Sequence, residues 1–439
     1  MVLGGVFINH SDGNLKNDQV TLVEKVSGML FDISKQPKFF TEGAGLTLKD
    51  KLQGNVIELN SLSDLATLGI TAYSGDATKD LMYGIPYYHI KHYFDIQGGT
   101  ARLFVMFADC SQNFDAIQQI QRAAHGIISQ FGVWTDQSLW KMTDPKADSY
   151  SVSLVTALQS EADELSARYA PAVILLNANT AVIKGTDADT KQVVLSKIPN
   201  LLTMGAHSVT VLLGQGLDTD VSAMQLANEN CTPVGNIGAA LGCIADGSVG
   251  ESIAWVKNRN VIGYFPDIEF GFGDVSLNAN KKFVSTLAYT SVANAQLDDI
   301  DNKGYVFLQK YAGIESGVYF TNDYTCDGTS DFHNIINNRT INKVDRMVRQ
   351  LLLPYTHAPL KVDSSTGYMS SADITIFQNL IGDALDVMKT NGEISGRTVS
   401  ISSTQNTLKT KQLLISCSVV PYGTADTIKV TTGLTVTTK

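Results

Sequence analysis

The sequence predicts an α+β (mixed α/β) protein of several domains, with a β-strand near each end of the chain. Short apolar runs alternate with amphipathic helical patterns between about residues 80 and 270, which indicates a sheet covered by helices. Two long amphipathic segments follow residue 330, and apolar–polar alternation typical of strands dominates from about residue 395 onward. Helices and strands thus alternate first and are then grouped, as in a chain of more than one domain.

The composition of the chain limits its number of domains and its classes of partner. A length of 439 residues predicts two to four domains at a prior of about 150 residues each. Charged residues make up 17%, below the ~25% of typical proteins, which favours surfaces buried against other chains. The net charge of -10 argues against a nucleic-acid partner, because such proteins carry a basic footprint.

Targeting and thiol signals are few. Five cysteines lie far apart with no CxxC pair, which predicts reduced thiols in a cytoplasm rather than disulfides or a zinc site. The start of the chain lacks a basic segment followed by a long apolar one, so no signal peptide is expected. No apolar run reaches the ~20 residues of a membrane span, so membrane insertion is not expected.

The first 70 residues predict little regular structure. Residues 1–10 are typical of a short strand, followed by the turn-forming run Ser11–Asn14. A lone strand has to pair with its own domain or with a neighbouring molecule. Residues 62–69 predict a short helix that Ser61 or Ser63 could cap.

The middle of the chain predicts a sheet with parallel strands and helices on its faces, because buried apolar runs and helical spacing follow one another. The expected strands are Leu103–Ala108, Ala172–Leu176 and Ser208–Leu213, and the expected helices are Phe114–Phe131, Leu154–Tyr169 and Val193–Met204.

The last third predicts a hairpin, helices and closing strands. A hairpin is expected from Tyr305–Gln309 and Gly317–Thr321 across a Gly-containing turn, and the second long helix should end at Asn391-Gly392. Thr398–Ser402 should pair with Leu413–Val420, and residues 427–437 alternate as a strand does. The expected helices are Lys281–Ala295, Asp331–Leu353 and Ala372–Thr390.

Motifs of catalysis are weak. Gly214–Asp218 follows a predicted strand and could cradle a phosphate, but the GxGxxG and GxxxxGK[ST] patterns are absent and Asp218 and Asp220 would repel an anion. A tight turn is the simpler interpretation. His89 and His92 could contribute to a metal site, although a third ligand is missing and an aromatic surface explains them as well. GxSxG does not occur, and the scattered acids Asp95, Asp109, Asp115, Asp144 and Asp148 are typical of solvated loops.

Basic residues gather on one face of the helix predicted after Asp331. An acidic protein partner would suit such a face in an acidic chain, and an ordinary solvated helix face is the alternative. The residues are Arg339, Lys343, Arg346 and Arg349.

The last 150 or so residues, with the N-terminal strand, resemble contractile tail sheath proteins of phages and injection systems. The resemblance is carried by "NRTINKVDRMVRQLLLPY", "ITIFQNLIGDALDVMKTNGEIS" and "LLISCSVVPYGTADTIKVTTGLTV". Asn338, Arg339 and Asp345 match the family's N…R…D helix, and Pro421–Gly423 matches a turn before the closing strand. The middle of the chain is similar only in its α/β character.

This resemblance implies a structural subunit rather than an enzyme, without a cofactor. Subunits would stack as hexameric rings or a helix around an inner tube, exchange terminal strands with neighbours, and contract to drive the tube through an envelope. Implied partners are further copies, the tube protein, and baseplate and terminator proteins, with assembly in the bacterial cytoplasm into a virion tail or injection particle. The implied regions are 1–20 (strand arm), 21–80 (packing on the sheath core), 80–270 (outward α/β domain), 271–425 (sheath domain) and 426–439 (strand arm).

Residues can be assigned to these roles. Apolar alternation at both ends suits β-augmentation of a neighbour's sheet edge. The expected inter-subunit residues are Val6, Phe7, Ile8, Ile428, Val430, Leu434 and Val436, and the candidate tube-facing residues are Arg339, Lys343, Arg346, Arg349 and Lys389. The rival hypothesis is an α/β enzyme or nucleotide-binding protein with a site at the carboxyl ends of the middle strands, and another phage or surface structural protein is a second rival.

Overall fold

The computed structural model describes most of the chain. The described residues are 24–34, 54–72, 80–98, 101–144, 149–180, 182–184, 189–191, 195–218, 234–270 and 287–434. The predicted N-terminal strand of residues 1–10 and Val436 lie outside them. Among the described residues no helix combines the length and the apolar character that a bilayer crossing requires.

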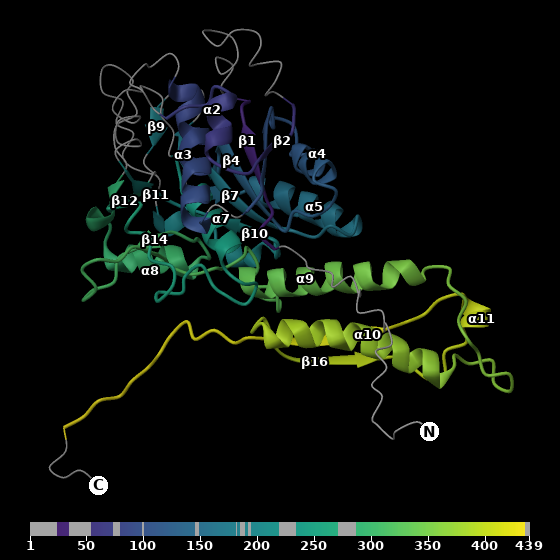
Figure 1. Ribbon diagram of the computed structural model, residues 1–439. Coiled ribbons are helices and arrows are strands. Elements are labelled where there is room, and N and C mark those ends of the chain that lie inside the picture. The colour runs from purple at the N-terminus through teal and green to yellow at the C-terminus, as the bar shows by residue number, and fades with distance from the viewer. Residues whose placement is uncertain are drawn as a thin grey trace, which may run out of the picture.

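A six-stranded sheet forms the centre of the larger body (Figure 1). Its order is β10-β7-β4-β1-β3-β2, and every neighbouring pair is parallel except β2, which runs antiparallel to β3 at one edge. β1 is central, so it pairs on both sides. The strands are β1 (Ser27–Asp32), β2 (Ile57–Leu59), β3 (Leu103–Ala108), β4 (Gln130–Ser138), β7 (Val173–Asn179) and β10 (Val209–Val211).

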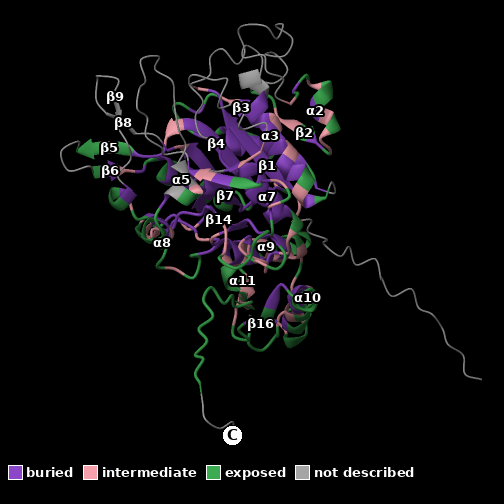
Figure 2. Ribbon diagram, turned by 90° about the vertical axis from the view of Figure 1, so that its left-hand side faces the viewer, coloured by how far each residue is buried: buried purple, intermediate pink, exposed green. Residues whose placement is uncertain are grey.

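Helices cover both faces of this sheet, because successive side chains of a strand point to opposite faces. Leu30 of β1 belongs to the apolar cluster shared with α4 (Ala116–Ala123) and α5 (Leu154–Ala167). Met29 and Phe31 belong instead to the cluster shared with α3 (Asp80–Gln97) and α7 (Ile237–Asp246). Figure 2 shows the resulting buried interior of the larger body.

α3 and α7 pack unusually closely because α7 carries two glycines one turn apart. A Cβ at Gly238 would lie 2.0 Å from the carbonyl oxygen of His89, and one at Gly242 would lie 3.0 Å from that of Tyr93. The absent side chains let the two backbones approach, as in other small-residue helix contacts. The sequence analysis predicted neither helix, because α3 contains Pro86 and α7 lacks a polar face.

Smaller elements surround this core. In the described part of the chain they are one short helix, three short sheets and two 3₁₀ turns. They are α2 (Ser63–Thr67), the pair β5 (Lys141–Asp144) and β6 (Ser149–Ser151), the pair β8 (Val182–Lys184) and β9 (Asp189–Lys191), the 3₁₀ turns η2 (Leu195–Lys197) and η3 (Leu201–Thr203), and the sheet of β11 (Gln215–Leu217), β12 (Asp267–Phe270) and β13 (Leu287–Ala288).

Residues 287–327 pack into the α/β body. Ile300, Tyr305 and Cys326 lie in the same apolar cluster as α4 and α5, and Leu212 forms a parallel bridge with Val306. The segment contains η4 (Tyr289–Ser291), α8 (Asn294–Asn302), β14 (Leu308–Gln309) and β15 (Tyr319–Phe320). Because β1 and β2 also belong to the sheet, the packing unit extends on both sides of the boundaries expected at 80 and 270.

The C-terminal body is smaller and more exposed. α9 (Ile335–Leu352) lies between the α/β body and α10 (Ser371–Thr390), as Figure 1 shows. The hairpin β16 (Ile394–Ser400) and β17 (Ser416–Pro421) completes it, and Val344, Met347, Ile381 and Leu385 are in its apolar cluster. η5 (Leu353–Tyr355) and α11 (Thr407–Thr410) connect these elements.

Several predicted elements are confirmed. The hairpin of β14 and β15, the two long helices, and the pairing of Thr398 with Ser418 in β16 and β17 all form. Gly392 has a φ of 72° just after α10, the left-handed conformation that ends many helices. The strands expected at Leu103, Ala172 and Ser208 are β3, β7 and β10.

Other expectations are wrong in extent. The helix expected over 114–131 ends at Ala123, because His125 and Gly126 turn the chain with φ of 54° and 79° before β4 begins. The helix expected over 193–204 is two 3₁₀ turns, the second capped by Asn200. Of the helix expected over 281–295, residues 287–291 form β13 and η4 instead. No serine caps α2, although Asp64 accepts hydrogen bonds from the amides of Asn60 and Ser61.

Candidate assembly interfaces and the basic face of α9

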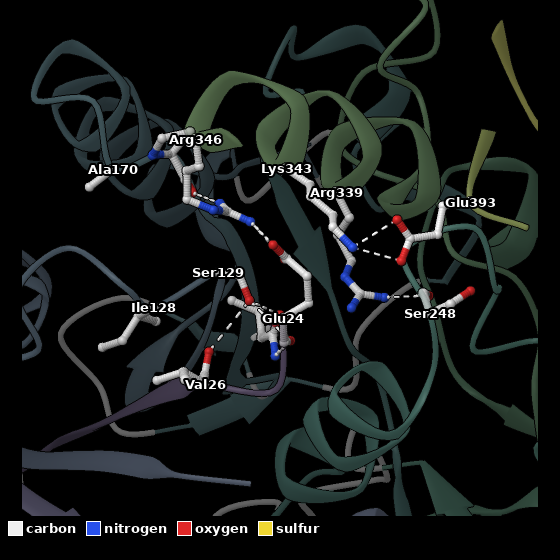
Figure 3. A network of polar contacts seen from close by, with 12 residues as sticks. Glu24, Val26, Ile128, Ser129, Ala170, Ser248, Arg339, Lys343, Arg346 and Glu393 are labelled. Carbon is white, nitrogen blue, oxygen red and sulfur yellow. Dashed lines mark hydrogen bonds and ion pairs between the residues drawn. The ribbon is translucent and has the colours of Figure 1, made fainter. Parts of the chain in front are cut away.

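Three of the four basic side chains of α9 have partners within the subunit. Arg339 and Arg346 are directed at the α/β body, and Lys343 is directed at Glu393. Asn334 caps the helix by accepting a hydrogen bond from the amide of Asn337, which sets where the helix begins. Arg339 and Arg346 are then only 2% and 5% exposed. Figure 3 shows these side chains, with Lys343, directed at partners from distant segments.

Arg346 joins α9 to two segments of the α/β body. Its Nη1 donates to the carbonyl oxygen of Pro171, at 2.6 Å. Its Nη2 lies 2.7 and 2.6 Å from the two carboxylate oxygens of Glu24. Pro171 shortly precedes β7 and Glu24 shortly precedes β1, so one guanidinium holds the entries of two parallel strands.

Arg339 lies at the carboxyl end of α7. It donates to the carbonyl oxygens of Ser248, at 3.0 Å, and Gly247, at 3.5 Å. A cation is favourable there because the last carbonyl groups of a helix carry partial negative charge. Burial lowers the pKa of Arg339 to about 10, which still leaves it charged at neutral pH.

Lys343 forms an ion pair within the C-terminal body. Its Nζ lies 2.6 and 2.7 Å from the carboxylate oxygens of Glu393, which directly precedes β16. Both side chains are largely buried, with 12% and 9% exposed. Asn338, from the motif behind the resemblance, donates to the carbonyl oxygens of Phe332 and Asn334 and thereby holds the turn that enters α9.

The expectation that Arg339, Lys343 and Arg346 face a tube is therefore corrected. The helical spacing of these residues predicted a shared basic face. The partners that bury the three side chains come from residues 24, 171, 247–248 and 393, which a helical pattern cannot reveal. Arg349 is exposed and stacks on the ring of Tyr169, 4.0 Å from its centroid. Lys389 is exposed on α10.

The hairpin of β16 and β17 offers sheet edges. Within the described residues each of its strands pairs only with the other. Cys417 and Val419 pack toward α9 and α10, whereas Ser416, Ser418 and Val420 are exposed. An edge with unpaired backbone groups is a template for strand addition.

The segment after β17 carries exposed apolar side chains. Ile428, Val430 and Leu434 are 80%, 75% and 108% exposed, and residues 424–434 form neither helix nor strand. Figures 1 and 2 show this segment leaving the C-terminal body. Val6, Phe7, Ile8 and Val436, expected in the same role, lie outside the described residues.

At the carboxyl edge of the parallel sheet, where an enzyme of this topology would bind its ligand, the carboxylate of Asp32 is bound by the chain itself. Asp32, at the end of β1, is 1% exposed and accepts four hydrogen bonds. They come from the amides of Ser34 and Cys110, from Thr135 Oγ1 at 2.6 Å and from Gln137 Nε2 at 2.8 Å. This carboxylate therefore has its hydrogen-bonding capacity used within the fold.

The Gly214–Asp218 turn is also closed. The amide of Gly216 donates to Asn236 Oδ1, and Asn236 Nδ2 donates to the carbonyl oxygen of Gly214. Residues 215–217 form strand β11 against β12 instead of a phosphate loop. The simpler interpretation, a structural turn, fits this geometry.

The histidine pair is structural in its contacts. His89 Nε2 donates to the carbonyl oxygen of Val234, and Nδ1 accepts from the amide of Gly238. Burial lowers the pKa of His89 to about 3. His92 Nε2 lies 3.3 Å from Asp218. Within the part of the chain that the structure describes, no three His, Cys, Asp or Glu side chains are arranged to hold a metal ion, and the four described cysteines are free thiols.

Comparisons with known proteins give a family and a fold. The family model "DUF2586, N-terminal domain" matches residues 43–324, and "DUF2586, C-terminal domain" matches residues 331–439. The division between them, at residues 325–330, falls shortly before α9 begins at Ile335. No curated protein matches the chain.

Solved structures match along the whole chain. The contracted helical sheath of the anti-feeding prophage is similar with a TM-score of 0.55 and 14% identity, over 99% of both chains. A chain of the same particle's baseplate gives 0.55 and 12%, over 99% of this chain and 100% of that one. The contracted PVC sheath of an extracellular contractile injection system gives 0.54 and 11%, over 99% and 98%. The chain therefore has the fold of contractile sheath proteins.

Proposed function

The chain belongs to the DUF2586 family, and from that premise we propose that it is the subunit of a contractile sheath. The observation that carries this proposal is the fold, which two contracted sheath structures share over 98% or more of every chain compared. In this role the protein polymerises around an inner tube, and the polymer shortens to push that tube through a cell envelope. Binding between subunits, not chemistry at a site, supplies the work.

Two features of the C-terminal body support polymerisation. The hairpin of β16 and β17 has edges that a further strand can join, and the segment that follows carries apolar residues with nothing covering them in the described chain. When two copies meet, the segment of one can supply a strand for the open hairpin edge of the other, and that hairpin can cover the apolar side chains of the segment. The C-terminal segment of one subunit, with Ile428, Val430 and Leu434, adds to the hairpin of the next by β-augmentation. Residues 1–12 and Val436 act in the same way on neighbouring copies.

The tube contact falls on the C-terminal body. With Arg339, Lys343 and Arg346 engaged inside the subunit, the cations of the predicted set that remain exposed are Arg349 and Lys389. Lys389 lies in the last turn of α10, which ends at Thr390. The α/β body then faces outward. Baseplate and terminator proteins bind the two ends of the polymer, which is assembled in a bacterial cytoplasm as hexameric rings of a phage tail or injection particle.

Negative-stain electron microscopy of the full chain expressed alone tests this function. Hollow tubes with a cogwheel cross-section are the expected result, because a sheath subunit carries its own polymerisation contacts. Uniform monomers would contradict it, and monomers that gain thermal stability with a nucleotide would favour the enzyme hypothesis. Closed shells would point to another structural role.

A further inference from the structure

Glu24 is held from two sides at the point where the chain enters β1. Its backbone carbonyl oxygen accepts hydrogen bonds from Ser129 Oγ, at 3.2 Å, and Gln130 Nε2, at 3.1 Å, both at the start of β4. Its carboxylate forms the ion pair with Arg346 of α9. Figure 3 shows Glu24 between these two groups of partners.

The ion pair between Glu24 and Arg346 is largely buried. The side chains of Arg346 and Glu24 are 5% and 10% exposed. Nη1 of the same guanidinium is fixed by the carbonyl oxygen of Pro171, so the fork cannot turn away without losing a second bond. Removing one partner of such a buried pair leaves the other charge without a counter-charge in a poorly solvated site.

We propose that Glu24 and Arg346 form a root clamp that divides any pull on residues 1–23 between the central sheet and α9. β1 is the central strand, with β3 and β4 on either side, so a pull along it would have to slip both ladders. The clamp takes up that pull before β1, because Arg346 ties Glu24 to the helix that also packs on α10 and β17. The origin of the pull, a neighbouring subunit, rests on the proposed function.

The clamp also explains why the basic residue here is an arginine. A guanidinium can hold the Pro171 carbonyl and the Glu24 carboxylate through two different nitrogens at once. A lysine would offer one nitrogen and could not keep both bonds in the same geometry. Arg346 is thus a positioning residue for the entry to β1.

Hydrogen exchange on the dispersed full-length subunit tests the clamp directly. The amide of Ser27 donates to the carbonyl oxygen of Arg102, so exchange of residues 24–28 reports opening of this end of β1. In Arg346→Met these amides should exchange at least about tenfold faster than in the wild type, because a local opening then costs less free energy. Arg346→Lys should fall between the two, and so should Glu24→Gln, which keeps an acceptor for the guanidinium.

Lys343→Met is the matched control. It removes a buried ion pair of the same helix but breaks a contact inside the C-terminal body, with Glu393. Exchange of residues 24–28 should stay at the wild-type rate in this variant. Unchanged exchange in Arg346→Met, or an equal increase in Lys343→Met, would overturn the clamp.

A second measurement tests the sharing of load. Where wild-type tubes form, brief sonication should leave Arg346→Met tubes shorter than Lys343→Met tubes, and equal lengths would overturn load sharing. Failure of the wild type to form tubes would instead overturn the sheath function, while the exchange result would still decide whether the clamp exists. The two failures are therefore distinguishable.

Discussion

Lys343 Nζ lies 2.6 Å from Glu393 Oε1, and this contact joins the middle of α9 to the residue that precedes β16. The pair links a helix to a hairpin inside the C-terminal body. It sits beside the contact of Arg339 with Ser248, so the residues that fix the C-terminal body internally also adjoin those that fix it to the α/β body (Figure 3).

Breaking this pair should destabilise the subunit. Glu393→Gln leaves the Lys343 ammonium buried without a counter-charge, so the free energy of unfolding should fall by about 3 kcal/mol. Urea unfolding followed by circular dichroism measures the change. Arg102→Gln is the control, because its partner Glu58 and Arg102 itself are 39% and 44% exposed. Surface pairs contribute about 1 kcal/mol or less, so equal losses in the two variants would contradict the prediction.

The apolar side chains after β17 should be needed for assembly and not for folding. Replacing Ile428, Val430 and Leu434 by serine removes exposed apolar surface, so the unfolding midpoint of the dispersed subunit should not change. Tubes counted by electron microscopy should disappear, as they should when residues 425–439 or 1–12 are deleted. Normal tubes from either deletion would contradict the strand-exchange mechanism.

The contact between α3 and α7 should tolerate no side chain at Gly238. A Cβ there would lie 2.0 Å from the carbonyl oxygen of His89, so Gly238→Ala has to push two helices apart. The free energy of unfolding should fall by about 3 kcal/mol or more. Gly263→Ala is the control, because no atom lies within 4 Å of a Cβ at that position. Thermal unfolding of the two variants separates close packing from a general effect of removing glycine.

His89 should make the subunit sensitive to acid. Its pKa is lowered from 6.5 to about 3 by burial, so the unfolded chain binds the proton first as the pH falls. Stability is thus retained above about pH 6.5 and is lost progressively between pH 6.5 and 3. Asp323 acts in the opposite direction between about pH 6 and 4, because burial raises its pKa from 3.8 to about 6.

The two contributions can be separated by mutation. His89→Gln keeps a donor and an acceptor but does not titrate, so its unfolding midpoint should fall less between pH 6.5 and 4 than that of the wild type. His357→Gln changes an exposed histidine and should follow the wild type. Parallel curves for His89→Gln and the wild type would show that His89 is not the acid-sensitive group.

Charge reversal at Lys389 should separate the sheath from its tube. Lys389 is exposed near the end of α10, so Lys389→Glu should leave the fold and the self-assembled tubes intact. Co-sedimentation with the purified tube protein should fall several-fold. Asp383→Lys, another exposed charge change on α10, is the control for a general effect of altered charge, and an equal loss in both would remove the specific role of Lys389.

Local patterns in the sequence determined much of the C-terminal body and the apolar strands. α10, the hairpin of β16 and β17, and β3 and β7 were predictable, because spacing and turn residues report which face of a segment is buried. The sheath fold was expected from a resemblance in family motifs, over the last 150 or so residues and the N-terminal strand. The extents of α4 and of residues 193–204 were not predictable, because single turns at His125 and Asn200 override a helical spacing that continues past them.

Only the tertiary structure decided what the basic face of α9 does. The sequence gives Arg339, Lys343 and Arg346 one face, and both a solvated surface and a partner surface satisfied that spacing. Their carboxylate and carbonyl partners lie as much as 322 positions away, so no local pattern relates them. Burying a cation requires a specific partner at a specific distance, and that requirement is met or missed only when distant segments pack together.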